Sequence, residues 1–94
     1  MYIMISKYSV PIEEVDKYRD DHLAFLDGLE SRGLVATAGR QNPPEGGVVV
    51  LAVDSAERAF ELMADDPYVK AGVAVYTATG FTPSRGALKD FPTA

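Results

Sequence analysis

His22 is the side chain best suited to acid–base chemistry, and it is the only histidine among the 94 residues. At about 100° per residue it shares an apolar helix face with Phe25 and Leu26. Histidine changes charge near neutral pH and often serves as a general base. The alternative is a core histidine that only hydrogen-bonds a neighbour. We favour a function, because His22 is the only polar residue on this face and burying it unbonded would cost about 1–3 kcal/mol.

Asp66, within the segment Asp65-Asp66-Pro67-Tyr68, is the second candidate. It closes a predicted helix, and helix ends in such folds lie at the rim of the sheet, where a carboxylate can reach an imidazole. A carboxylate behind a histidine fixes the tautomer of the ring and stabilises the imidazolium. The alternative is a stop signal, since aspartate before proline is common in turns. The local sequence alone favours that alternative.

Three further residues are candidates for substrate binding: Arg40, Gln41 and Tyr68. Arg40 and Gln41 end a predicted strand. Alternation places Arg40 on the same face as Ala36 and Ala38, where its guanidinium can hold a substrate carboxylate through two hydrogen bonds. Tyr68, like the other tyrosines, can line a pocket. The alternatives are an exposed charge at a strand end and ordinary aromatic packing.

Composition excludes several other kinds of site. The chain has no cysteine and one histidine, which leaves no disulfide and no conventional cluster of transition-metal ligands. It also lacks the glycine-rich nucleotide motifs and the GxSxG motif, so we predict no metal and no cofactor. The net charge of −5 disfavours nucleic acid. No signal-peptide pattern or membrane-length apolar run is present, so we expect a cytoplasmic protein that does not bind membranes.

Hydrophobic periodicity predicts the elements that position these residues. Strands are expected at residues 2–8, 34–41, 48–53 and 73–81, and helices at residues 12–32 and 55–64. The order βαββαβ predicts an α+β fold of the ferredoxin-like type, with a four-stranded antiparallel sheet and two helices on one face. At this length residues 1–94 form one domain. Residues 82–94 are expected to be an irregular tail.

Residues at the helix ends set the expected helix limits. Gly33 stops the first helix, and Asp54, followed three residues later by Glu57, caps the second. The second helix is expected to bury Phe60 and Met63, because both fall on its apolar face.

The third predicted strand, residues 48–53, is apolar on both faces. Such a strand must be covered on both sides, and two helices cover only one side of the sheet. A second copy packed sheet to sheet is the simplest cover for the other side. We therefore predict a homodimer.

Four segments together resemble the YciI-like (YCII-related) family over about residues 1–83. They are RDDHLAFL (19–26), AGRQ (38–41), GGVVVLA (46–52) and ADDPYVKAGV (64–73). The resemblance implies a dimeric α+β barrel. It also implies that His22 and Asp66 match a histidine and an aspartate proposed as the family's catalytic pair. The wider superfamily is similar to muconolactone isomerases, dehydrochlorinases and cofactor-free monooxygenases.

The preferred function is a cofactor-independent lyase or isomerase acting on a small acidic or aromatic-derived metabolite. His22 would move a proton, Asp66 would orient the imidazole, and Arg40 would hold a carboxylate. The first alternative is a binding or regulatory module, in which the same pocket holds a small molecule without turnover. A weaker alternative is an oxygenase of the same barrel class, using either haem bound through His22 or the substrate alone.

Overall fold

The computed structural model describes residues 1–93. Its elements are β1 (Tyr2–Tyr8), α1 (Ile12–Asp16), α2 (Arg19–Ser31), β2 (Val35–Arg40), β3 (Gly46–Leu51), α3 (Ala56–Met63), α4 (Pro67–Lys70) and β4 (Ala74–Gly80). All four predicted strands are found, with limits within about two residues of those expected. Gly33 has a φ of 73° and ends the helical segment as predicted.

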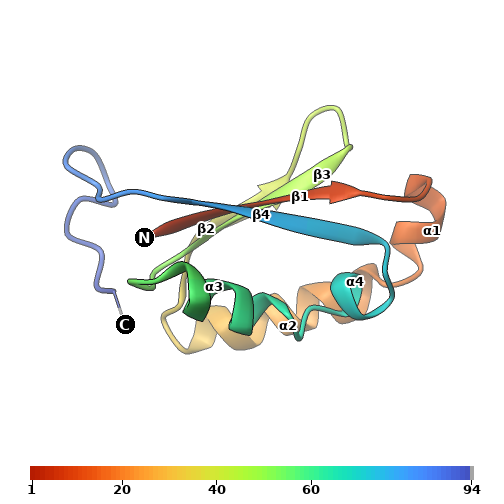
Figure 1. The fold of residues 1–94 in the computed structure, drawn as a ribbon, viewed down its shortest axis with the longest axis horizontal. Coiled ribbons are helices and arrows are strands. Elements are labelled where there is room, and N and C mark those ends of the chain that lie inside the picture. Colours follow the sequence, from red (N-terminus) through yellow and green to blue (C-terminus); the bar gives the residue numbers. More distant parts are fainter. Residues whose placement is uncertain (94) are drawn as a thin grey trace.

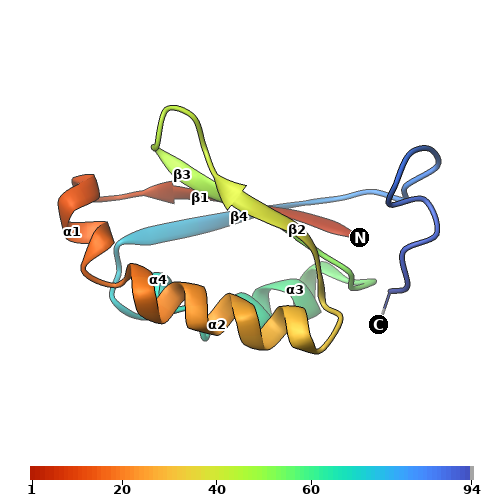
Figure 2. The ribbon, with the colours of Figure 1, turned by 180° about the vertical axis from the view of Figure 1, so that it is seen from behind.

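The strands form one sheet in the order β2-β3-β1-β4, and every neighbouring pair is antiparallel. Helices α2 and α3 lie side by side on one face of this sheet (Figures 1 and 2). The predicted ferredoxin-like α+β arrangement is therefore confirmed. Within residues 1–93, no helix has the length and apolar character needed to cross a bilayer.

The main core lies between the sheet and helices α2 and α3. Met4 of β1, Leu51 of β3 and Tyr76 of β4 contribute the sheet side of this core. Leu29 of α2 and Met63 of α3 contribute the helix side. Since alternate strand residues point to opposite faces, each strand presents one row of side chains to the helices. The site described below uses that same row.

The helix predicted at residues 12–32 is two helices. Between α1 and α2, Tyr18 has φ −108° and ψ 5°, outside the helical region. The break allows Val15 of α1 to pack with Tyr68 in a separate small cluster. Tyr18 itself is 37% exposed. No glycine or proline marks the break, so tertiary packing produces it.

The cap of α3 lies one residue later than predicted. Ser55 Oγ accepts a hydrogen bond from the backbone N–H of Arg58 at 3.1 Å, so Ser55 and not Asp54 is the N-cap. Met63 is buried as expected. Phe60 is 46% exposed, which contradicts the prediction, because the helix turns Leu62 inward instead.

Strand β2 does not alternate regularly. Its register with β3 shifts between Val35 and Thr37. As a result Ala36 packs in a cluster with Val50 on the sheet face away from the helices, whereas Arg40 faces the helices and pairs with residues there. The predicted continuous alternation from Ala36 to Arg40 is therefore wrong, because a local irregularity interrupts it.

The sheet face away from the helices is covered in part by the chain itself. Leu88 and Phe91 of the C-terminal tail pack against a cluster that includes Val50. Residues 82–93 of the predicted tail contain no helix or strand, residue 94 lies outside the described residues, and Figure 1 shows the tail beside one end of the sheet. Farther along this face, Ile5 is 38% and Val75 is 63% exposed.

Candidate active site

The structure brings His22 and Asp66 into direct contact. His22 lies on α2, and Asp66 is the N-cap of α4. His22 Nδ1 is 2.8 Å from Asp66 Oδ1, although 44 residues separate them in the chain. The Asp66 side chain is fully buried, and the His22 side chain is 12% exposed. The pair therefore has one enclosed end and one accessible end.

The carboxylate of Asp66 is held by two further hydrogen bonds. The Tyr76 hydroxyl donates to Oδ2 at 2.7 Å, and the backbone N–H of Tyr68 donates to Oδ1 at 2.9 Å. Aspartate before proline thus serves as a helix cap and as the partner of His22 at once. Burial, together with the neighbouring Asp66, raises the pKa of Tyr76 and keeps its hydroxyl a neutral donor.

This network assigns the tautomer of His22. A carboxylate only accepts, so Nδ1 carries the proton that it donates to Asp66. In the neutral ring the lone pair then resides on Nε2. Because Nδ1 is engaged with the buried carboxylate, Nε2 is the nitrogen left for a molecule in the adjoining pocket.

Aromatic packing fixes the orientation of the imidazole. The Tyr68 ring stacks on His22 with centroids 3.9 Å apart and an interplanar angle of 5°. Tyr8 in turn meets Tyr68 edge-on, with centroids 6.1 Å apart. The imidazole is thus held by a hydrogen bond at one edge and by a ring on one face, which leaves it little rotational freedom.

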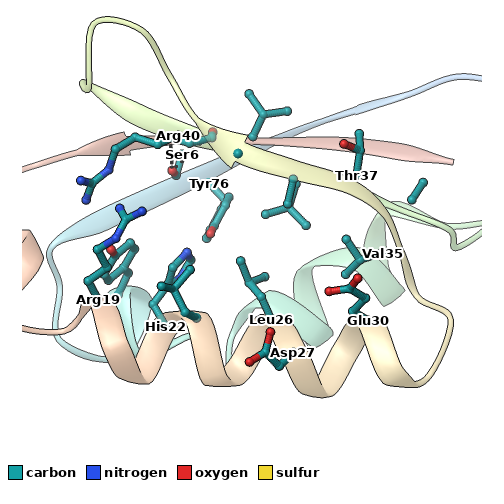
Figure 3. Close-up of a pocket in the computed structure, with 18 of the residues that line it drawn as sticks. Ser6, Arg19, His22, Leu26, Asp27, Glu30, Val35, Thr37, Arg40 and Tyr76 are labelled. Atoms are coloured by element: carbon teal, nitrogen blue, oxygen red, sulfur yellow. Dashed lines mark hydrogen bonds between the residues drawn. The ribbon is translucent and has the colours of Figure 1, made fainter.

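A pocket of about 450 Å³ lies between α2 and the helix-facing side of the sheet (Figure 3). His22 and Leu26 of α2 line one wall. Ser6 of β1, Val49 of β3 and the length of β2 line the other. Such a mixed lining suits a small, partly apolar molecule with a few polar groups.

Arg40 lines this pocket, but its guanidinium already has partners. Nε donates to the Tyr8 hydroxyl at 2.9 Å, and Nη2 donates to Asp16 Oδ1 at 2.6 Å. Burial alone would lower the pKa of Arg40, but the hydrogen bonds to Asp16 and Tyr8 outweigh it and raise the pKa. Arg40 thus braces Tyr8 and the end of α1.

The other predicted binding residues are placed differently. Tyr68 lines the pocket beside His22. Gln41 is not part of the lining, and its backbone N–H donates to the Gly46 carbonyl at 2.9 Å. Its position gives no support to the predicted role in substrate binding.

Two polar pocket residues, Ser6 and Arg19, were not singled out from the sequence, whereas Tyr76 was among the tyrosines expected to line a pocket. Ser6 Oγ accepts the backbone N–H of Gly47 at 2.8 Å, so a buried hydroxyl lies in the middle of β1. Arg19 lies three residues before His22, a helical spacing that places both on one side of α2. That spacing was the available signal for Arg19.

Comparisons with known proteins identify the family. The family model described as YCII-related domain matches residues 1–82. The chain belongs to the YCII-related domain family. An uncharacterized protein of Haemophilus influenzae is 33% identical over 85 residues, which covers 78% of this chain and 87% of that protein. The resemblance found in the sequence is therefore confirmed.

A solved structure shares the fold of this YCII-related chain. It is 5-chloro-2-hydroxyhydroquinone dehydrochlorinase (TftG) from Burkholderia phenoliruptrix, in complex with 2,5-dihydroxybenzoquinone. The TM-score is 0.71 at 17% identity, with 86% of this chain and 93% of that chain covered. At this identity the likeness establishes the common α+β architecture.

Proposed function

We propose that this YCII-related protein is a cofactor-independent lyase or isomerase that moves a proton on a small acidic or aromatic-derived molecule. The observation that carries the proposal is the position of His22. Its Nδ1 is hydrogen-bonded to the buried Asp66, and its ring lines a pocket. A positioned base with a free nitrogen is the main requirement of such a reaction.

The proposed step begins with His22 Nε2 taking a proton from a carbon or oxygen of the substrate. The electron pair left behind forms a new double bond. In an elimination the leaving group departs with its bonding pair, whereas in an isomerisation the imidazolium returns the proton to another atom. Asp66 stabilises the imidazolium throughout, because its carboxylate faces the Nδ1 proton.

The dehydrochlorinase of the same fold supports the elimination form of this proposal. The compound in the name of that enzyme, 5-chloro-2-hydroxyhydroquinone, is a chlorinated, hydroxylated aromatic ring. The pocket of this chain has the aromatic rings of Tyr8 and Tyr68 and the apolar Leu26 and Val49 in its lining. A flat ring with acidic hydroxyls matches that lining, because aromatic and aliphatic walls favour a planar apolar body.

The test is turnover of 5-chloro-2-hydroxyhydroquinone, followed as chloride release, and of a panel of small carbonyl acids, followed as deuterium uptake at carbon in D2O. We expect His22→Gln to abolish turnover and Asp66→Asn to reduce it by at least about 100-fold, because a neutral amide does not stabilise the imidazolium as the carboxylate does. Glu61→Gln, on the exposed side of α3, is the matched control.

Full turnover by His22→Gln would refute the proposal. Thermal stabilisation by a panel compound, without turnover of any, would instead support the binding-module alternative.

We also propose that the protein forms a homodimer through the sheet face away from the helices. Ile5 and Val75 leave apolar surface exposed there, and the tail, which packs against the cluster that includes Val50, lies beside one end of the sheet (Figure 2). A second copy would bury that surface. Light scattering should give a dimer at micromolar concentration, and Val75→Lys should shift it to monomer. A monomeric wild-type protein would contradict this proposal.

A further inference from the structure

The hydroxyl of Tyr68 makes no hydrogen bond to any group in residues 1–93. The residue is only 2% exposed. Among the side-chain nitrogen and oxygen atoms described for residues 1–93, its hydroxyl oxygen is the one buried atom with no hydrogen bond. Buried polar groups are normally hydrogen-bonded, so an unpaired hydroxyl on a residue that lines a pocket indicates that a bound ligand supplies the missing hydrogen bond.

Arg19 has no carboxylate partner within residues 1–93. It lines the pocket and takes part in none of the ion pairs formed within residues 1–93. It is also the first residue of α2, where the helix dipole disfavours positive charge. Local structure therefore gives no reason for an arginine at this position.

Arg19 and Arg40 point toward one another across the same end of the pocket (Figure 3). Asp16 compensates the charge of Arg40, but no described carboxylate compensates that of Arg19. Burial and the neighbouring Tyr8 raise the pKa of Tyr68, while the positive charges of Arg40 and Arg19 and the proximity of the Arg40 side chain oppose that rise. The three groups therefore gather at one end of the pocket.

We infer that Arg19 and the Tyr68 hydroxyl form a binding subsite for an anionic oxygen of the substrate, a carboxylate or an ionised phenol. Both groups would donate to that oxygen, and Arg40 would act as a positioning residue that braces the wall. This deepens the proposed function and rests on it for the identity of the bound molecule as a substrate.

The stacking of Tyr68 on His22 connects the subsite to the chemistry. With ring centroids 3.9 Å apart, an anion held at the Tyr68 hydroxyl lies near the imidazole. The remainder of the molecule can then present an acidic proton to Nε2. Asp27 and Glu30 line the pocket farther along α2 (Figure 3), so a second anionic group at that end would be repelled.

The experiment measures binding of benzoate, ionised 4-nitrophenol and neutral benzamide at low ionic strength. The readout is the NMR signal of the single histidine ring, supported by calorimetry. We expect benzoate or nitrophenolate to bind the wild type at least about tenfold more tightly than benzamide, the range of one charge-assisted hydrogen bond. The anion that binds more tightly shows whether the subsite prefers a carboxylate or an ionised phenol.

Arg19→Gln should weaken binding of that anion about tenfold or more, and Tyr68→Phe should weaken it at least threefold. Arg19→Lys, which keeps the charge, should restore part of the affinity. Arg58→Gln, an exposed arginine on α3, is the matched control and should bind as the wild type does. Neither test variant should unfold the protein, since one removes an unpaired hydroxyl and the other a disfavoured cation.

The inference is overturned if no anion binds, if benzamide binds equally well, or if Arg19→Gln and Tyr68→Phe bind as the wild type does. His22→Gln, whose binding is measured by calorimetry because it lacks the histidine signal, separates this result from the proposed function, since it should keep anion binding and lose turnover. Arg19-dependent binding in a protein without any turnover would leave the subsite standing and refute only the catalysis. Turnover that depends on His22, together with anion binding that does not change in Arg19→Gln, would support the catalysis and refute the subsite.

Discussion

Replacing Asp66 tests the network on which the site depends. Its carboxylate is fully buried and accepts from His22 Nδ1, the Tyr68 N–H and the Tyr76 hydroxyl. Asp66→Ala removes all three acceptor contacts at once. The Tyr68 N–H and the Tyr76 hydroxyl belong to residues that are 2% and 8% exposed, so each would be left an unpaired buried donor.

The size of the effect follows from those two donors. Each unsatisfied buried group costs about 1–3 kcal/mol, so Asp66→Ala should lose about 2–6 kcal/mol of the free energy of unfolding. Small domains have about 5–15 kcal/mol in total, which places this variant near the limit of folding. Asp66→Asn keeps an oxygen for His22 and Tyr68 and can donate to the Tyr76 oxygen, so it should lose only about 1–2 kcal/mol.

Urea unfolding followed by far-UV circular dichroism measures these values. Asp65→Ala, at the exposed neighbouring position, is the matched control and should stay within about 0.5 kcal/mol of the wild type. If Asp66→Ala loses less than about 1 kcal/mol, or loses the same as Asp66→Asn, the carboxylate does not hold the three donors as described.

Three further predictions follow from the same contacts. The pKa of Tyr76 is raised on folding. Its contribution to stability is therefore present below the ordinary tyrosine pKa of about 10 and is lost as pH rises above that value. The free energy of unfolding should fall more steeply above pH 10 in the wild type than in Tyr76→Phe. Nitrogen-15 NMR of neutral His22 should show the Nδ1–H tautomer, and Asp66→Asn should weaken that preference; a dominant Nε2–H form in the wild type would contradict the assigned network. Ser55→Ala should cost about 1 kcal/mol through loss of the α3 cap, measured by thermal unfolding, and no change would disprove that cap.

The sequence by itself determined the order of the four strands and of the two helical segments that connect them. Alternating or continuous apolar residues marked all four strands, and the positive φ required at Gly33 marked the end of the first helical segment. These signals are local, because side-chain period and glycine conformation depend on neighbours along the chain. The βαββαβ order then restricted the sheet to the observed antiparallel arrangement.

The sequence also selected His22 and Asp66 as candidates, because an isolated polar residue on an apolar face needs a partner. It left open whether Asp66 was a helix stop or that partner. The tertiary structure shows that one carboxylate oxygen does both. That result depends on how α4 packs beside α2, which no local pattern specifies.

Other features were decided by tertiary structure alone. The break at Tyr18, the outward turn of Phe60 and the irregularity in β2 arise where packing overrides local preference. Tyr76 and Asp66 are in contact because β4 packs beside the start of α4. Arg19 of α2 and Tyr68 of α4 line one pocket because those two helices pack together. Contacts between distant residues are set by the relative placement of whole elements, so the sequence named the acid–base pair while the fold supplied its surroundings.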